Sequence, residues 1–364
     1  MKGLILCAGQ GTRLQPFTFT RAKCLMPVNG EPIIISTVKR MVEMGITEIG
    51  IVVNESQGEN IQETVGNGEK MGASITYILQ KRALGLADAV RSGYAFIQSE
   101  PFLLMLGDNI IAGPLEKLVQ SVVLGEASAS LLLAPVDNPS MFGIASIEDN
   151  KIVELAEKPQ KPNSNLAIVG AYAFNKDIWS MIDGLVPSAR GEYELTDAIQ
   201  LLLRQGKRIA YSITTDPFFD IGTYDGWLKA NRYLMGHAPR SDSNAIEQGT
   251  DVQVIPPVFC HPTAKVYQSV IGPYVYIGPG SIVNHCKIEN SILMENTRLS
   301  NINAIDSLFG ANVNCSDLTI PDKPSQFILG DKSLVHTSIT SHVNAQDAVP
   351  ADMGLGEAKS GADS

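Results

Sequence analysis

The chain has 364 residues, of which 44% are hydrophobic and 18% are charged, and its formal net charge is −10. This length suggests two domains, and the acidic balance argues against a nucleic-acid-binding surface, which would need a basic face. No run of about 18 apolar residues is present, which argues against a membrane-spanning helix. The 5 cysteines form no Cys-x-x-Cys pair, which favours reduced thiols in the cytoplasm over a disulfide framework or a zinc site.

The first predicted strand, residues 3–8, runs into a glycine-rich loop that is followed by two cations. The loop contains Gly9 and Gly11, and Arg13 and Lys23 come after it with no carboxylate between them. Glycines let backbone N–H groups approach a phosphate closely. We therefore interpret this segment as a binding site for the phosphates of a nucleotide, at the carboxyl end of the strand.

Other glycine-rich motifs fit this segment less well. A dinucleotide fingerprint needs a third glycine and a helix directly after it, whereas the chain has Leu14 and Pro16 there. A Walker loop needs Gly-Lys-Ser/Thr, which does not follow. The apolar run of about six residues is short for a secretory signal. A structural glycine turn with solvated cations is the remaining alternative.

Apolar runs and amphipathic stretches alternate along the next part of the chain. Strands are predicted at residues 48–53, 75–78, 101–107 and 129–134, and helices at residues 33–44, 59–71, 87–97 and 115–123. Strands separated by helices indicate βαβ units and a mainly parallel sheet. Further along, we predict a hairpin from residues 142–147 and 151–155, strands at 167–174 and 208–213, and a helix at 197–205.

Two aspartates in this part of the chain are candidates for a metal site. Asp108 follows a buried apolar run and a glycine, and Asp220 lies between two aromatic residues and a glycine turn. Ligands bind at the carboxyl edge of an open α/β sheet, and Mg²⁺ prefers few carboxylates together with phosphate oxygens and water. The pair could therefore hold one Mg²⁺, although a single aspartate at the end of a strand is often only a cap.

The pattern of the sequence changes after a polar stretch at residues 239–244, which predicts a hinge between domains. Ile271, Ile277 and Val283 repeat every six residues, and a glycine or asparagine follows each of them. A six-residue period resembles the hexapeptide repeat of left-handed parallel β-helices. We predict four or five coils of about 18 residues each, with three hexads per turn. The last residues are rich in Ala, Gly, Ser and Asp, which predicts a disordered tail.

The motif at residues 9–14 (GQGTRL), together with residues 23–28 (KCLMPV), resembles the signature of the sugar-1-phosphate nucleotidylyltransferases. The chain is most similar to the long form of glucose-1-phosphate thymidylyltransferase, which has a C-terminal left-handed β-helix. The resemblance implies a Rossmann-like nucleotide-diphospho-sugar transferase fold in a catalytic domain at 1–236. A linker at 237–251, a β-helix domain at 252–338 and a disordered tail at 339–364 would follow.

The same resemblance implies a set of site residues. Arg13 and Lys23 would be catalytic, and Asp108 and Asp220 would bind Mg²⁺. The nucleotide would be bound by Ala8, Gly9, Gly11, Thr12, Arg13, Gln80 and Gly85. The sugar phosphate would be bound by Asn109, Gly143, Glu157, Lys158, Gly170, Tyr172 and Glu192. An isolated Glu157-Lys158-Pro159 is more often an exposed charged turn, and its place between matched motifs favours the functional role.

The segment expected to contact the base departs from the short thymidylyltransferases. These have a proline-rich stretch and a glutamine where this chain has Ala83, Leu84 and Asp88. The amide of Gln80 could pair with the N3–H and carbonyl edge of a pyrimidine. The departures favour the long forms and leave the choice between dTTP and UTP open.

We expect an enzyme that transfers a nucleotidyl group from dTTP to glucose 1-phosphate and releases pyrophosphate. UTP is the alternative nucleotide. Less favoured alternatives are a hexapeptide acyltransferase, for which His261 or His285 would be the base, and a regulatory protein that keeps the pocket without the chemistry. A face of the β-helix could mediate a homo-oligomer.

Overall fold

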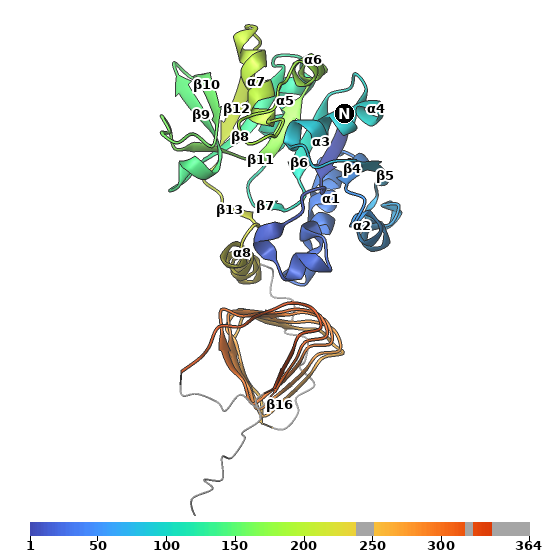
Figure 1. The fold of residues 1–364 in the computed structure, drawn as a ribbon, viewed down its shortest axis with the longest axis vertical. Helices are drawn as coiled ribbons and strands as arrows, with labels where there is room; N and C mark the ends of the chain where they lie inside the picture. The colour runs from blue at the N-terminus through green and yellow to red at the C-terminus, as the bar shows by residue number, and fades with distance from the viewer. Residues whose placement is uncertain (238–250, 317–322, 337–364) are drawn as a thin grey trace, which may run out of the picture.

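The computed structural model describes residues 1–237, 251–316 and 323–336. An α/β part lies above a triangular coil of short strands, which Figure 1 views end-on. Most of the expected linker and the whole of the expected tail lie outside the described residues. No helix within the described ranges has the length and apolar character needed to cross a membrane.

A nine-stranded mixed sheet forms the centre of the α/β part. Its main path, in spatial order, is β10 (Lys151–Glu157), β9 (Gly143–Glu148), β11 (Leu166–Phe174), β6 (Phe102–Leu106), β1 (Lys2–Leu6), β4 (Glu48–Val53) and β5 (Ser74–Leu79). β8 (Ala129–Pro135) also pairs with β11, and β12 (Ile209–Ile213) pairs with β8. β1 is parallel to both of its neighbours, whereas β11 is antiparallel to β6 and β8. The predicted Rossmann-like class is confirmed.

Both faces of the sheet are buried. On β1, Leu4 and Leu6 belong to one apolar cluster, whereas Ile5 belongs to the cluster on the other face. The first cluster is covered by α3 (Leu86–Ser92), α6 (Ile178–Asp183) and α7 (Leu195–Arg204), and the second by α1 (Ile33–Glu43), α2 (Gly58–Val65) and α5 (Glu116–Val123). This burial explains why the central strands read as continuous apolar runs.

Several predicted boundaries are wrong for local reasons. The helix predicted at 59–71 ends at Val65, because Gly66 has a φ of +66°, and a short 3₁₀ helix, η4 (Glu69–Met71), follows. The helix predicted at 87–97 is divided at Gly93 into α3 and α4 (Tyr94–Ile97). The hairpin forms as predicted, with Asp149 and Asn150 both at positive φ in its turn.

The sequence analysis did not predict several elements. They are α6, α8 (Tyr224–His237), β2 (Pro27–Val28), β3 (Glu31–Pro32), β7 (Asn109–Ile111), β13 (Phe218–Asp220), η1 (Thr12–Leu14), η2 (Phe17–Phe19), η3 (Lys23–Leu25) and η5 (Pro139–Met141). β7 and β13 form a separate antiparallel ribbon. This ribbon and the 3₁₀ turns lie around the predicted site.

Three parallel sheets form the β-helix, and its predicted fold class is confirmed. The first has β14 (Gln253–Val254), β17 (Val270–Ile271), β20 (Lys287–Glu289) and β23 (Asn303–Ile305). The second has β15 (Val258–Cys260), β18 (Val275–Ile277), β21 (Ser291–Leu293), β24 (Leu308–Phe309) and β26 (Ile328–Leu329). The third has β16 (Lys265–Tyr267), β19 (Ile282–Asn284), β22 (Arg298–Ser300), β25 (Asn314–Ser316) and β27 (Leu334–His336).

The coils of the β-helix are not the uniform 18-residue turns that were expected. Hydrogen-bonded residues on successive coils lie 17 positions apart at Ser269 and Cys286, 16 apart at Ser281 and Thr297, and 20 apart at Ser307 and Phe327. Residues with positive φ recur along the β-helix, where a left-handed conformation turns the chain tightly. They include Gln268, Tyr274, Gly280, His285, Asn290, Asn296, Asn301, Asp306, Asn312 and Lys332.

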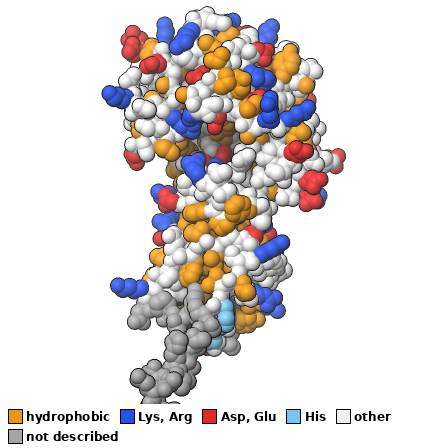
Figure 2. All heavy atoms as spheres, in the orientation of Figure 1, with side chains coloured by type: hydrophobic (Ala, Val, Ile, Leu, Met, Phe, Trp, Pro, Cys, Tyr) orange, Lys and Arg blue, Asp and Glu red, His pale blue; other side chains and the backbone are white. Residues whose placement is uncertain are grey.

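An apolar interface joins the β-helix to the α/β part. The outward side chains of the second sheet, including Tyr276, Ile292 and Leu308, share a buried cluster with Phe17 and Trp227. Figure 2 shows hydrophobic side chains gathered at this junction. The Trp227 indole also donates a hydrogen bond to the Pro27 carbonyl over 2.7 Å. The segment between the two predicted phosphate-binding cations therefore rests directly on the β-helix.

Candidate active site

The glycine-rich loop leaves the carboxyl end of β1 in a tight turn. Gly11 has a φ of +66°, and its carbonyl accepts hydrogen bonds from the Leu14 N–H (2.9 Å) and the Thr18 hydroxyl (2.8 Å). A Cβ atom on Gly11 would lie 2.8 Å from the Thr18 methyl carbon. Beside Gly9 the space is open, since a Cβ atom there would meet nothing within 4 Å. The loop is thus packed against Thr18 at Gly11 and open at Gly9.

Lys23 forms hydrogen bonds with both predicted metal ligands. Its Nζ donates hydrogen bonds to Oδ2 of Asp108 and, over 3.1 Å, to Oδ1 of Asp220. The guanidinium of Arg13 approaches the other oxygen of Asp220, with Nη2 and Oδ2 separated by 3.6 Å. The structure therefore brings these four side chains together. Lys23 is mostly buried, and the two carboxylates remain partly exposed.

The ribbon of β7 and β13 explains why the two aspartates meet. Asn109 on β7 is the register partner of Asp220 on β13, and the Ile221 N–H donates to the Asp108 carbonyl over 3.0 Å. Asp108 follows β6 through Gly107, whose Cβ position would collide with Sγ of Cys7. A side chain at residue 107 is therefore excluded, and the chain can turn directly from the central sheet into the ribbon.

The charges around Lys23 favour its protonated form. Burial alone would lower the pKa of Lys23, but the carboxylates of Asp108 and Asp220 outweigh burial and raise it. The described residues contain no group of three His, Cys, Asp or Glu side chains that could form a complete protein cage for a metal. Two carboxylates nevertheless fit Mg²⁺, which takes its other ligands from phosphate oxygens and water. The ammonium group of Lys23 lies between the two carboxylates.

The segment predicted to contact the base is packed against the sugar motif. Gln80 is buried at the end of β5, and its N–H donates to the Val53 carbonyl over 2.9 Å. Gly85 has a φ of +107°, and a Cβ atom there would lie 2.6 Å from the Tyr193 carbonyl oxygen. The Tyr193 N–H in turn donates to the Leu84 carbonyl over 2.7 Å. Hydrogen bonds therefore couple residues 84–87 to the segment containing Glu192.

Glu157 lies at the centre of the predicted sugar site. It is the register partner of Gly143, and its Oε2 accepts a hydrogen bond from the Thr196 hydroxyl over 2.6 Å. A Cβ atom on Gly143 would lie 2.8 Å from that hydroxyl, so only glycine leaves room here. Burial raises the pKa of Glu157, and the Thr196 hydrogen bond with the charges of Lys158 and Arg190 offsets this only in part.

Arg190 is a site residue that the sequence analysis missed. Its Nη2 lies 2.8 Å from Oε1 of Glu194, 3.4 Å from Oε2 of Glu192 and 3.5 Å from Oε1 of Glu157. One guanidinium thus lies within ion-pair distance of three carboxylates. A signal was available, because Arg190 directly precedes Gly191-Glu192-Tyr193-Glu194 and is the nearest cation to these acids in the sequence.

β11 contributes Gly170 and Tyr172 in different ways. Gly170 has a φ of +73° at an irregularity in the pairing of β11, and a Cβ atom there would collide with Nδ2 of Asn109. Tyr172 is only 5% exposed and stacks on Phe174 in the core, where burial and the charge of Glu157 raise its pKa. Tyr172 therefore offers little surface for contact with a sugar.

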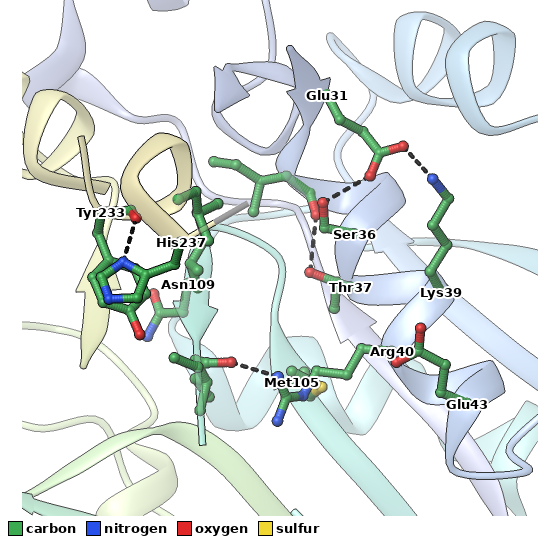
Figure 3. A pocket seen from close by; sticks show the side chains of 15 residues that line it. Glu31, Ser36, Thr37, Lys39, Arg40, Glu43, Met105, Asn109, Tyr233 and His237 are labelled. Atoms are coloured by element: carbon green, nitrogen blue, oxygen red, sulfur yellow. Dashed lines mark hydrogen bonds and ion pairs between the residues drawn. The ribbon is translucent and has the colours of Figure 1, made fainter. Parts of the chain in front are cut away.

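A separate cavity of about 450 Å³ lies between α1, β7 and the end of α8. Figure 3 shows Glu31, Ser36 and Lys39 on one wall and the adjacent rings of Tyr233 and His237 on the other. Asn109 is the one predicted site residue among those that line it. This cavity is therefore distinct from the group formed by Arg13, Lys23 and the two aspartates. In Figure 2, charged side chains of both signs surround a hollow in the α/β part.

The chain matches known proteins over most of its length. Residues 2–236 match the family model described as nucleotidyl transferase. A glucose-1-phosphate thymidylyltransferase of Streptomyces antibioticus is 33% identical over 353 residues, which cover 92% of this chain and 99% of that protein. The low-salt glycan biosynthesis nucleotidyltransferase Agl11 of Haloferax volcanii is 35% identical over 359 residues, with coverages of 92% and 99%.

A solved structure also matches about two thirds of the chain. It is a protein of Bacillus anthracis, named for a proposed glucose-1-phosphate thymidylyltransferase activity and crystallised with sucrose. The match has a TM-score of 0.61 and 35% sequence identity, and covers 64% of this chain and 94% of that chain.

Proposed function

The chain belongs to the nucleotidyl transferase family, and from this premise we propose that it transfers a thymidylyl group from dTTP to glucose 1-phosphate in the presence of Mg²⁺. The products would be dTDP-glucose and pyrophosphate. The observation that carries the proposal is the contact of Lys23 with both Asp108 and Asp220, beside the glycine-rich loop and Arg13. The names of two relatives, one from Streptomyces antibioticus and one from Bacillus anthracis, support the choice of substrates.

The reaction asks mainly for positioning and charge compensation. A phosphate oxygen of the sugar 1-phosphate attacks the α-phosphorus of the triphosphate, and the bond from that phosphorus to the bridging oxygen breaks to release pyrophosphate. The nucleophile is already anionic, so no strong general base is needed. Arg13 would neutralise the triphosphate, and Lys23 would move from the carboxylates to bridge phosphates near the transferred group. Bound Mg²⁺ would supply further compensation of the phosphate charge, held by Asp108 and Asp220.

The sugar would lie over the β9–β10 hairpin. Glu157 would accept hydrogen bonds from hydroxyl groups, and the backbone of Gly143 would leave room for the ring. The charge of Lys158 would be available for the sugar phosphate, since its Nζ lies 3.9 Å from Glu157 and its side chain is exposed. Arg190 would offset the mutual repulsion of the carboxylates in this region.

The alternative functions have less support from the described residues. His285 occupies a left-handed corner position of the β-helix, with a φ of +50°, and His261 pairs only with the neighbouring Thr263 over 2.9 Å. Among the residues that the structure describes, no carboxylate orients either histidine, as one commonly orients the base of an acyltransferase. The compact arrangement of Arg13, Lys23 and the two aspartates argues for catalysis rather than regulatory binding.

A substrate matrix tests the proposal. Purified full-length protein is incubated with each of dTTP, UTP, dCTP and ATP against several sugar 1-phosphates, with Mg²⁺ or with EDTA, and pyrophosphate release is measured. We expect the highest rate with dTTP and glucose 1-phosphate, and none with EDTA. A higher rate with UTP would reassign the nucleotide. No pyrophosphate from any pair would overturn the proposed function.

A further inference from the structure

The side-chain amide of Gln80 has a fixed orientation. Its Nε2 donates to Oδ2 of Asp88 over 2.8 Å and lies 3.5 Å from the Gly85 carbonyl oxygen. An ionised carboxylate and a backbone carbonyl can only accept hydrogen bonds. The NH₂ end of the amide must therefore face these two groups, and the opposite orientation would bring the amide oxygen against two acceptors. The chemistry of the neighbours sets the orientation.

Asp88 is itself held in place. It lies in the first turn of α3, and its Oδ1 is 3.6 Å from Nη1 of Arg91. The Arg91 guanidinium lies over the ring of Tyr193, 5.1 Å from the centroid. The ion pair with Arg91 and the hydrogen bond from Gln80 hold the Asp88 side chain from two sides, one at each carboxylate oxygen. Gln80 is 5% exposed, so its side chain has little freedom to turn away from Asp88.

The carbonyl oxygen of Gln80 is left for a ligand. No donor from the described residues reaches Oε1, because the hydrogen bonds of the side chain all start from Nε2. Oε1 is also absent from the buried polar atoms that lack a partner in the described chain, so it keeps contact with solvent. The segment thus presents one hydrogen-bond acceptor, Oε1 of Gln80, that no donor of the described residues satisfies.

We propose that Asp88 is a specificity-determining positioning residue, which fixes Gln80 so that it offers only an acceptor to the base. The inference rests on the proposed function, in which Gln80 reads a pyrimidine. Thymine and uracil carry a donor at N3, which this acceptor satisfies. Cytosine carries an acceptor at N3, which would face the oxygen of Gln80. The pair selects the imino bases over cytosine and leaves thymine and uracil equivalent at this position.

The test compares kcat/KM for dTTP and dCTP in wild-type protein and in the Asp88→Asn variant. Asparagine can donate as well as accept, so both orientations of Gln80 become possible. We expect wild-type protein to favour dTTP over dCTP by about 100-fold or more, and Asp88→Asn to reduce this ratio by about tenfold or more. Asp183→Asn is the matched control, because Oδ1 of Asp183 lies 3.7 Å from Nε of the same Arg91 and the Asp183 side chain is exposed. Its ratio should equal that of wild-type protein.

A second measurement needs no variant. Wild-type protein should use N3-methyl-dTTP about tenfold or more less efficiently than dTTP, because the methyl group removes the N3 donor. If thermal denaturation shows that Asp88→Asn is unfolded, Asp88→Ser replaces it, since a hydroxyl also donates and accepts. Equal use of N3-methyl-dTTP and dTTP, or an unchanged dTTP/dCTP ratio in a folded Asp88 variant, would overturn the inference alone. Wild-type protein that releases no pyrophosphate from any pyrimidine triphosphate would overturn the proposed function as well.

Discussion

Nζ of Lys23 donates a hydrogen bond to Oδ1 of Asp220 over 3.1 Å, although 197 residues separate them in the chain. The same ammonium group bonds to Asp108. In the described structure, the single positive charge of Lys23 thus offsets part of the charge of the two carboxylates that we propose as magnesium ligands. A divalent cation at this position would have to displace the ammonium group, and the displaced lysine would then be free to meet a phosphate.

We predict that Lys23→Ala gives a protein that Mg²⁺ stabilises more than it stabilises wild-type protein. Without Lys23, two carboxylates face each other across a partly buried space, and the cation relieves their repulsion. Melting temperatures with and without Mg²⁺ measure the effect, and pyrophosphate release should fall about 10²- to 10³-fold. Lys39→Ala is the control, because Lys39 pairs with Glu31 in a more exposed position. Equal Mg²⁺ responses in the two variants would contradict the shared site.

Gly170→Ala should lower the free energy of unfolding by more than the cost of placing an alanine at positive φ. The new methyl group would collide with Nδ2 of Asn109, and the φ of +73° adds the cost of a left-handed residue. Gly125→Ala is the matched control, since Gly125 also has a φ of +73° but no atom within 4 Å of its Cβ position. The control should lose about 1 kcal/mol of unfolding free energy, and Gly170→Ala about 1–3 kcal/mol more. Equal losses in urea unfolding would show that Asn109 moves away freely.

The sequence predicted the central sheet well, because its strands are buried on both faces and read as continuous apolar runs. Leu4, Ile5 and Leu6 show this on β1, where successive residues enter different clusters. α8 was not predicted. Gly226 and Asn231 interrupt its helical pattern, and its buried side chains, such as Trp227, pack on the β-helix rather than on the sheet. Such an interface has no local signal in the sequence.

The site residues that belong to a sequence motif were predicted. The contacts that arise only when distant segments fold together were not. Asp108 and Asp220 were paired from two separate motifs, and the ribbon of β7 and β13 places them together. Arg190 directly precedes the recognised motif at residues 191–197 and was left out of it, and its contacts with acidic groups of β10 and of the segment before α7 arise from the fold. The pairing of Gln80 with Asp88 likewise depends on geometry, since one residue ends a strand and the other begins a helix.

Glu157→Gln should stabilise the folded protein by an amount that grows as the pH rises. Burial raises the pKa of Glu157 above its ordinary value of 4.5, so the folded state holds the proton more tightly than the unfolded state. The contribution of Glu157 to the free energy of unfolding is therefore fully present below pH 4.5. It is lost as the pH rises through the pKa of Glu157 in the folded state. The neutral amide of the variant does not ionise and avoids this loss.

Melting curves of wild-type protein and Glu157→Gln from about pH 4 to about pH 8 measure this difference. The variant should also lose about 10- to 100-fold in kcat/KM for the sugar phosphate, because a neutral acceptor binds hydroxyl groups less strongly than a carboxylate. Glu154→Gln, on the exposed side of the same strand, is the control. A constant difference in melting temperature across the pH range would contradict the raised pKa.

The β-helix should contribute to catalysis by holding the segment between Arg13 and Lys23. Arg21 forms an ion pair with Glu295, and the Thr20 hydroxyl donates to Asp331 over 2.8 Å. Both contacts join the loop to the β-helix, and the side chains of the ion pair are partly exposed. Glu295→Ala would free the loop on one side, so that the cations lose their fixed positions and the effective concentration of catalytic groups falls.

We expect Glu295→Ala to lower kcat/KM for dTTP by about five- to tenfold while the melting temperature changes little, because a partly exposed ion pair contributes only about 1 kcal/mol or less to stability. Glu289→Ala, on another sheet of the β-helix and in no ion pair within the described residues, should leave the kinetics unchanged. Arg21→Ala and the double variant should both match Glu295→Ala, since each removes the same contact. Additive losses in the double variant would show that Arg21 and Glu295 act separately, and the β-helix would then have no role in positioning the loop through this pair.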